Sequence, residues 1–314
     1  MTTIISKRHP LKFYFSLTFG TLFLVGLGTL LLFASIDILQ KEQPATKEYF
    51  MPVFSLALYM LAFGMLFTYW KNSPKITLDK QSIRIGDEAF YLKEIKDIAL
   101  TGKMPFKFII TFPMEATAIL FNNGTEKILF DDMYSNSSDI KLFLEQVVLK
   151  KQDFKPSITN KTSEHSIRFE NEEIFKGNQF TSLRGISLWG LIGFFAFMLV
   201  TKWQSPPLGL LIFFGAFGAF WFVLHSWLMH FFGLTTDYLV VRNHNFIWKV
   251  KPYRLKDIKE VVFETQGKQP NCMRVITKDF KNKLYPAGTL RDKTWLDLKD
   301  KLEAKGVTVR NECI

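Results

Sequence analysis

The sequence alternates between long apolar runs and stretches rich in charge. Four runs contain no Asp, Glu, Lys or Arg: 13–36, 49–70, 185–201 and 203–236. Because a helix needs about 20 mostly apolar residues to cross a bilayer, the pattern predicts four spans, the last with its core at 208–232. Buried core helices and, for the first run, a cleaved signal peptide are the alternatives, and both usually have shorter apolar segments.

The four predicted spans pair into two hairpins. Residues 37–48 join the first pair and residues 202–207 join the second. Linkers this short make the two helices of a pair antiparallel neighbours.

The remaining sequence predicts two small modules of short strands followed by one helix. In the first module the expected strands are 75–78, 82–85, 90–92, 95–100, 106–112, 117–121 and 127–130. In the second they are 238–242, 245–250, 258–265, 273–277 and 283–285. Each series ends in a helical pattern, with apolar residues at Ile140, Phe143, Leu144 and Val147 and at Trp295, Leu298 and Leu302. Ser137 or Ser138, Asp292 and Gly306 are the expected caps.

A short repeat relates the two halves. Residues 92–98 (LKEIKDI) match residues 255–261 (LKDIKEV), with four identities and three conservative changes. Both copies follow two spans and two strands, which indicates an internal duplication. The predicted organisation is a hairpin at 1–71, a module at 72–155, a linker at 156–184, a hairpin at 185–233 and a module at 234–314.

This layout, with its repeated motif, resembles the bacterial pleckstrin-homology (PH)-domain membrane proteins, some of which carry tandem copies. The resemblance covers nearly the whole chain by layout, not by a specific motif. It implies PH-like modules, each a split β-barrel or sandwich closed at one end by a helix. It also implies membrane association, and it supplies no catalytic residues.

Basic residues flank the spans on one side. They are Lys7, Arg8, Lys12, Lys71, Lys75, Lys176, Arg184, Arg242, Lys249 and Lys251. The positive-inside rule then predicts that both termini and both modules are cytoplasmic. For a protein of this kind we expect the bacterial cytoplasmic (inner) membrane.

Motifs of common enzyme and metal sites are missing from the sequence. There is no phosphate-binding glycine loop, no H-E-x-x-H, no G-x-S-x-G and no Cys/His cluster. Asp131-Asp132 is the only Asp-Asp pair of the first module, and Cys272 and Cys313 match no zinc spacing. We therefore expect no enzymatic activity, no cofactor and no metal.

Charge points to the second module as a contact site. The chain has a net charge of +11, and residues 234–314 hold 17 Lys/Arg against 10 Asp/Glu. Five cations fall within eleven residues: Lys249, Lys251, Arg254, Lys256 and Lys259. Near a membrane each contributes about 1 kcal/mol of attraction to anionic lipid. The alternative is a solvated strand edge protected by lysine; a nucleic-acid role is disfavoured because the charge adjoins a membrane anchor.

Two histidines, His225 and His230, are the only ionisable residues inside a predicted span. Such residues are functional candidates by default. Both fall in the last third of their helix, which favours an imidazole near the headgroups.

We expect a non-enzymatic membrane protein whose modules scaffold assembly or contact anionic lipid. One alternative is an immunity or accessory protein that binds one dedicated protein partner. Another is a lipid or small-molecule transport component. The expected partner is membrane lipid, with a protein partner or self-association under the alternatives.

Overall fold

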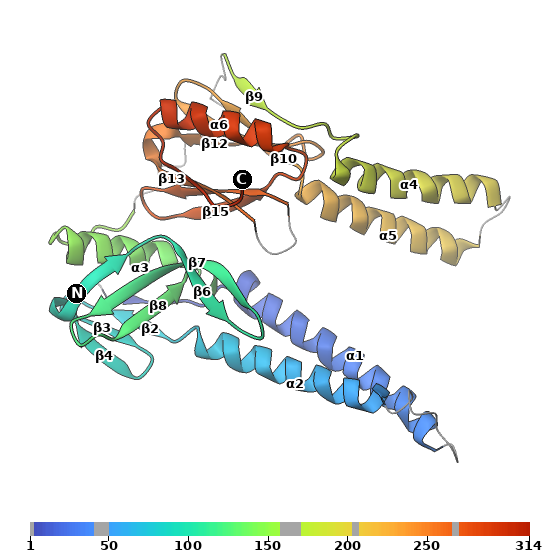
Figure 1. Cartoon of the computed structure of the whole chain (residues 1–314), viewed down its shortest axis with the longest axis horizontal. Coiled ribbons are helices and arrows are strands. Elements are labelled where there is room, and N and C mark those ends of the chain that lie inside the picture. The colour runs from blue at the N-terminus through green and yellow to red at the C-terminus, as the bar shows by residue number, and fades with distance from the viewer. Residues whose placement is uncertain (1–2, 41–49, 158–170, 203–206, 266–269) are drawn as a thin grey trace. The chain divides into compact units, whose positions relative to one another are not determined.

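A computed structural model describes residues 3–40, 50–157, 171–202, 207–265 and 270–314 of the chain (Figure 1). The predicted linkers at 37–48 and 202–207 fall largely outside the described residues. The chain forms two units, Met1–Ser157 and Ile158–Ile314.

Among the described residues, four helices are long and apolar enough to cross a membrane. They are α1 (Ser16–Leu39), extended at its start by a π-helical turn (Pro10–Phe15), α2 (Phe50–Lys71), α4 (Leu183–Lys202) and α5 (Leu208–Trp227). At most 17% of any of these candidate spans is buried within the protein, so they are not core helices. The sequence prediction of four such helices is confirmed, although α5 ends five residues earlier than expected.

Hydrogen bonds hold each pair of helices together, and Figure 1 shows the two helices within each pair running side by side. In the first pair the Ser55 hydroxyl donates to the Gly28 carbonyl at 2.7 Å, and the Thr29 and Tyr59 hydroxyls lie 2.8 Å apart. In the second pair the Trp221 indole donates to the Ser187 carbonyl at 3.1 Å. Polar groups that lack water find partners across the helix pair.

Unit 1 contains two antiparallel sheets and a helix. The first sheet has the order β1 (Ile4–Ile5), β2 (Ile76–Leu78), β3 (Ser82–Ile85) and β4 (Glu88–Tyr91). In the second, the long strand β7 (Thr111–Phe121) pairs with β5 (Ile95–Ala99), β6 (Lys103–Lys107) and β8 (Glu126–Phe130). Helix α3 (Ser137–Phe143) follows and continues as a π-helical segment, Leu144–Leu149.

Unit 2 also contains two sheets and a helix. Its first sheet has the order β12 (Lys251–Arg254), β11 (Tyr238–Asn243), β10 (His230–Leu234) and β9 (Glu173–Phe175). Its second has the order β15 (Asn282–Pro286), β14 (Cys272–Thr277), β13 (Ile258–Glu264) and β16 (Val309–Asn311), with β16 parallel to β13. Helix α6 (Asp292–Ala304) ends at Gly306, whose positive φ of 78° confirms the predicted helix stop.

The strand pairing has the same register in the two units. One row across the first sheet of unit 1 reads Ile4, Leu78, Ile83 and Phe90. The corresponding row of unit 2 reads Glu173, Leu234, Leu239 and Tyr253. The repeated sequence motif also has one structure in both places. A 3₁₀ turn (Leu92–Glu94 or Leu255–Asp257) leads into a strand whose register shifts at Ile95/Asp97 or at Ile258/Glu260.

Each helix pair is inserted between the first and second strands of a sheet. β1 precedes α1 and pairs with β2, which follows α2. β9 precedes α4 and pairs with β10, which follows α5. The sequence-based boundaries had assigned residues 4–5 to the first hairpin and residues 173–175 to the linker, whereas the structure places both in the sheets.

Two other strand predictions were wrong. Residues 106–112, predicted as one strand, span the end of β6, a turn at 108–110 and the start of β7. Residues 245–250, also predicted as a strand, form a loop, because the Asn243 carboxamide oxygen accepts from the backbone N–H groups of Asn245 and Phe246.

Aromatic side chains fill the cores. In unit 1, Phe90 from the first sheet stacks on Phe121 from the second with 4.1 Å between ring centroids. In unit 2, the buried Trp295 of α6 contacts Phe263 of the second sheet and Phe232 of the first. Helix α6 therefore closes the space between both sheets.

Candidate membrane-contact site

The end of α5 joins directly to the first sheet of unit 2. Asn243, at the end of β11, donates from its carboxamide to the Ser226 carbonyl at 2.7 Å. The backbone of His244 donates to the Met229 carbonyl at 3.1 Å. This edge of the sheet therefore lies where α5 would leave a bilayer.

Residues 244–250, here called the α5-proximal loop, pack against the last turns of α5. Phe246 contacts Phe222, and the Lys249 ammonium lies 4.9 Å from the Trp227 ring centroid and 4.4 Å from that of Phe246. Ile247 and Trp248 are 78% and 73% exposed. A lysine beside exposed aromatic and apolar side chains at a span end is typical of a membrane interface.

The structure divides the five predicted lipid-binding cations into two groups. Lys251 pairs with Val241 near the α5 end, whereas Arg254 pairs with Tyr238 at the opposite end of β12. At about 3.3 Å per residue the two lie about 10 Å apart along the strand. Lys256 follows in the 3₁₀ turn at that far end.

Lys259 also lies away from α5. Its ammonium sits 3.8 Å from the ring centroid of Phe280, in the turn between β14 and β15. The other end of β15 adjoins α5, because His230 hydrogen-bonds the Pro286 carbonyl there. Lys249 and Lys251 therefore lie near the α5 end, while Arg254, Lys256 and Lys259 lie at the far end.

Two further cations lie at the α5 end. Arg184, in the first turn of α4, packs against Gly288, whose N–H donates to the Leu228 carbonyl. Lys176, one residue after β9, lies close enough to His244 to affect its titration. In the sequence both are only flanks of the third span, because their proximity to Lys249 depends on strand pairing across the helix pair.

The two histidines have different positions. His225 lies in the last turn of α5 and stacks on Trp221, with 4.2 Å between ring centroids. His230 is the first residue of β10, so its predicted place inside a span was wrong. The prediction failed because the apolar run continues from the helix into Phe231 and Phe232, and Phe232 belongs to the sheet core.

Histidines beside α5 are kept neutral by burial. Burial lowers the pKa of His230 to about 4, and Lys249 and Lys283 act in the same direction. The His230 Nδ1 atom lies 2.9 Å from the Pro286 carbonyl oxygen, so in the neutral ring this nitrogen carries the proton and donates. Burial likewise lowers the pKa of His244 to about 4. At neutral pH these residues therefore add no charge to the site.

The corresponding cations in unit 1 are engaged by protein groups. Arg8 donates two hydrogen bonds to the Ser73 carbonyl, and Lys12 pairs with Asp132 at 2.7 Å. Asp131 forms a buried ion pair with Lys141, also at 2.7 Å. The Asp131-Asp132 pair thus takes part in two ion pairs.

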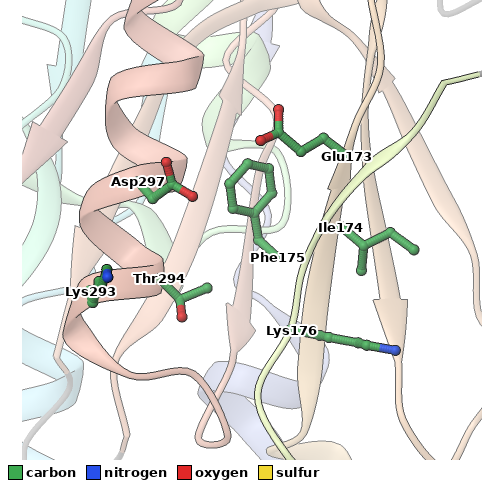
Figure 2. A pocket seen from close by; sticks show the side chains of 7 residues that line it. All are labelled: Glu173, Ile174, Phe175, Lys176, Lys293, Thr294 and Asp297. Carbon is green, nitrogen blue, oxygen red and sulfur yellow. The ribbon is translucent and has the colours of Figure 1, made fainter.

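One shallow cavity lies between β9 and α6 (Figure 2). Its volume is about 270 Å³, and both acidic and basic side chains line it, among them Glu173, Lys293 and Asp297. Phe175 points toward α6, whereas Ile174 and Lys176 point away (Figure 2). Ligand pockets are commonly larger and mainly apolar, so this cavity gives little support for a small-molecule site. Within the described ranges no group of three or more His, Cys, Asp or Glu side chains could hold a metal ion.

Comparison with protein-family models gives no match. Comparison with curated proteins gives no match either.

Proposed function

We propose that this chain is a non-enzymatic membrane protein whose modules are held at the membrane surface, where unit 2 contacts anionic lipid. The observation that carries the proposal is the position of Lys249 over Trp227, beside the exposed Ile247 and Trp248. Lys251, Lys176 and Arg184 add positive charge at the same end of the unit. The contact surface is thus the α5 end of unit 2 and not the whole basic segment 249–259.

The connection of helices to sheets supports a surface-held module. Because each hairpin lies between two paired strands, the module is attached to its helices at two points. Two attachments separated by one strand spacing, about 4.8 Å, restrict tilting of the module far more than one flexible linker would. Such a module keeps one fixed edge toward the lipid, as a scaffold or a lipid-contacting domain requires.

Further features favour a tandem PH-like organisation. Each unit has a four-stranded sheet, then a meander (β5–β7–β8 or β13–β14–β15), then a helix. The matching registers and the shared turn and bulge at the repeated motif are most simply explained by duplication. In this proposal both modules and both termini lie on the cytoplasmic side of a bacterial inner membrane, as the flanking Lys and Arg residues indicate.

The test is lipid binding by the full chain in a mild neutral detergent. Native mass spectrometry would count phosphatidylglycerol bound at increasing lipid concentration, with phosphatidylcholine as the neutral comparison. Lys249→Glu/Lys251→Glu should weaken phosphatidylglycerol binding several-fold and leave phosphatidylcholine binding unchanged. The charge-matched control is Lys256→Glu/Lys305→Glu, which should have a much smaller effect. Lys256 lies in the far 3₁₀ turn, and Lys305 precedes β16 on the side of Ile258, so both lie at the far end of unit 2. Equal loss in both double variants, or no loss in either, would contradict the assignment.

A further inference from the structure

The hairpin of β6 and β7 in unit 1 exposes an apolar tip. Residues 108–110, here called the hairpin tip, are Phe-Ile-Ile, and Ile109 and Ile110 are 70% and 75% exposed. The segment 103–114 contains two lysines and no acidic residue. Exposed neighbouring isoleucines at a turn are costly in water, since turns are ordinarily built from polar residues and glycine.

This hairpin lies against the C-terminal half of α2. Phe106 is fully buried and lies 5.2 Å from Tyr69, measured between ring centroids. Further along, a Cβ added to Gly64 would lie 3.9 Å from the Phe108 ring. Because Gly64 precedes the last residue of α2, Lys71, by seven positions, and an α-helix rises about 1.5 Å per residue, Phe108 lies about 10 Å below the end of the helix.

Helix α2 is itself a candidate membrane span, so a distance along it from Lys71 corresponds to a depth in the bilayer. A hydrocarbon core of about 30 Å is bordered on each side by several ångströms of headgroups. A tip about 10 Å below the Lys71 end would reach the headgroup boundary and the first part of the acyl chains. Phe63 and Phe67, on the same part of α2, are 71% and 61% exposed, as lipid-facing side chains would be.

The backbone of the hairpin suits this depth. Its strands pair up to Phe106–Phe112 and Lys107–Thr111, which leaves only the three tip residues outside the ladder. Unpaired backbone groups are tolerated at the interface but not in the centre of a bilayer. Lys107 lies on the module side of the tip, from where its long side chain can extend to the phosphates.

We propose that the hairpin tip of unit 1 inserts into the lipid leaflet next to α2 and buries Ile109 and Ile110 among acyl chains. This contact is separate from the proposed phosphatidylglycerol site, since it lies in the other unit and depends on apolar side chains. It gives unit 1, whose Arg8 and Lys12 are engaged within the protein, an anchor that does not rely on free cations.

The test uses spin labels on the full chain reconstituted in phosphatidylcholine/phosphatidylglycerol liposomes. Native thiols are removed by Cys272→Ala/Cys313→Ala, and one label is placed by Ile109→Cys or Ile110→Cys. Phe63→Cys on α2 is the lipid reference and Tyr91→Cys, which is 56% exposed at the end of β4, is the water reference. Relaxation by oxygen reports exposure to lipid, and relaxation by a water-soluble nickel complex reports exposure to water.

At both tip positions we expect oxygen accessibility close to that of the Phe63 label and nickel accessibility several-fold below that of the Tyr91 label. Nickel accessibility equal to the Tyr91 label would show a tip in water and overturn the proposal. Low accessibility to both reagents would show a tip covered by protein and would also overturn it. Neither result bears on Lys249, so failure here and failure of the headgroup contact are distinguishable.

Discussion

The guanidinium carbon of Arg8 lies 4.0 Å from the ring centroid of Trp70. Arg8 follows β1 and precedes α1, and Trp70 is in the last turn of α2, so this contact joins the two ends of the first helix pair. The same guanidinium donates to the Ser73 carbonyl through Nε and Nη2, at 3.1 and 2.9 Å. One side chain therefore ties the strand before the hairpin to the strand after it.

Replacing Arg8 should loosen this junction. Loss of a cation–π contact and of hydrogen bonds from a charged group predicts a cost of roughly 2–3 kcal/mol for Arg8→Ala. Arg8→Lys keeps the charge but not the two-pronged geometry, so its cost should be intermediate. Thermal unfolding of the full chain in detergent would measure both. The exposed Arg84→Ala on β3 is the control, and an equal shift in the control would contradict a special role for Arg8.

The buried ion pair of Arg274 and Glu264 predicts non-additive mutations. The two side chains are each 1% exposed, and Nη2 lies 2.8 Å from Oε1. Arg274→Met leaves an uncompensated buried carboxylate and should destabilise unit 2 by about 3–5 kcal/mol. Removing both charges, in Arg274→Met/Glu264→Leu, should restore most of the loss. A double variant as unstable as the sum of the single variants would contradict this account.

Unit 2 should lose stability in mild acid. The pKa of His230 is about 4 in the folded protein, against about 6.5 when unfolded. Between these values the unfolded chain binds the additional proton, so stability is complete above pH 6.5 and falls as the pH approaches 4. The cost is at most about 3 kcal/mol for this residue. Positive charge on Lys249, Lys283 and His244 lowers the pKa of His230 further, and the rings that contact it are those of Trp227 and Tyr285.

His230→Gln should reduce this dependence, because a glutamine amide can still donate to the Pro286 carbonyl but does not titrate. Roughly half of the pH effect should remain, since the pKa of His244 is lowered to a similar value. The measurement is the unfolding temperature from pH 7 to pH 4.5. An unchanged slope in the variant would rule out His230 as a source of the effect.

Much of the architecture could be predicted from the pattern of residues, and the failures have physical causes. The 82–85 strand was predicted at its observed bounds because its apolar residues alternate. The turn at 108–110 was missed because Phe-Ile-Ile contains no turn residue; its contact with α2 is a tertiary effect. β1 and β9 were missed because two or three residues carry no periodicity, and their partners lie beyond an entire hairpin.

The candidate site could be predicted only in part. Five cations that are neighbours in the sequence suggested one basic surface. In the structure Lys251 and Arg254 lie at opposite ends of β12, so the five cations divide between the two ends of unit 2. Lys249 was found from its charge, whereas its contact with Trp227 depends on the loop that Asn243 stabilises. Strand pairing then brings Lys176 and Arg184 to the same end, which linear spacing could not reveal.

The most direct test of the account is the side of the membrane on which each module lies. Single cysteines at Tyr91 in unit 1 and Lys305 in unit 2, and one at Ala45 between the first two spans, would be labelled with a membrane-impermeant maleimide in the Cys272→Ala/Cys313→Ala background. In intact cells the Ala45→Cys protein should react and the other two should not. In inverted vesicles Tyr91→Cys and Lys305→Cys should both react and Ala45→Cys should not. If Tyr91→Cys and Lys305→Cys were labelled from opposite sides of the membrane, the account would be contradicted, because it holds both modules on the same membrane face.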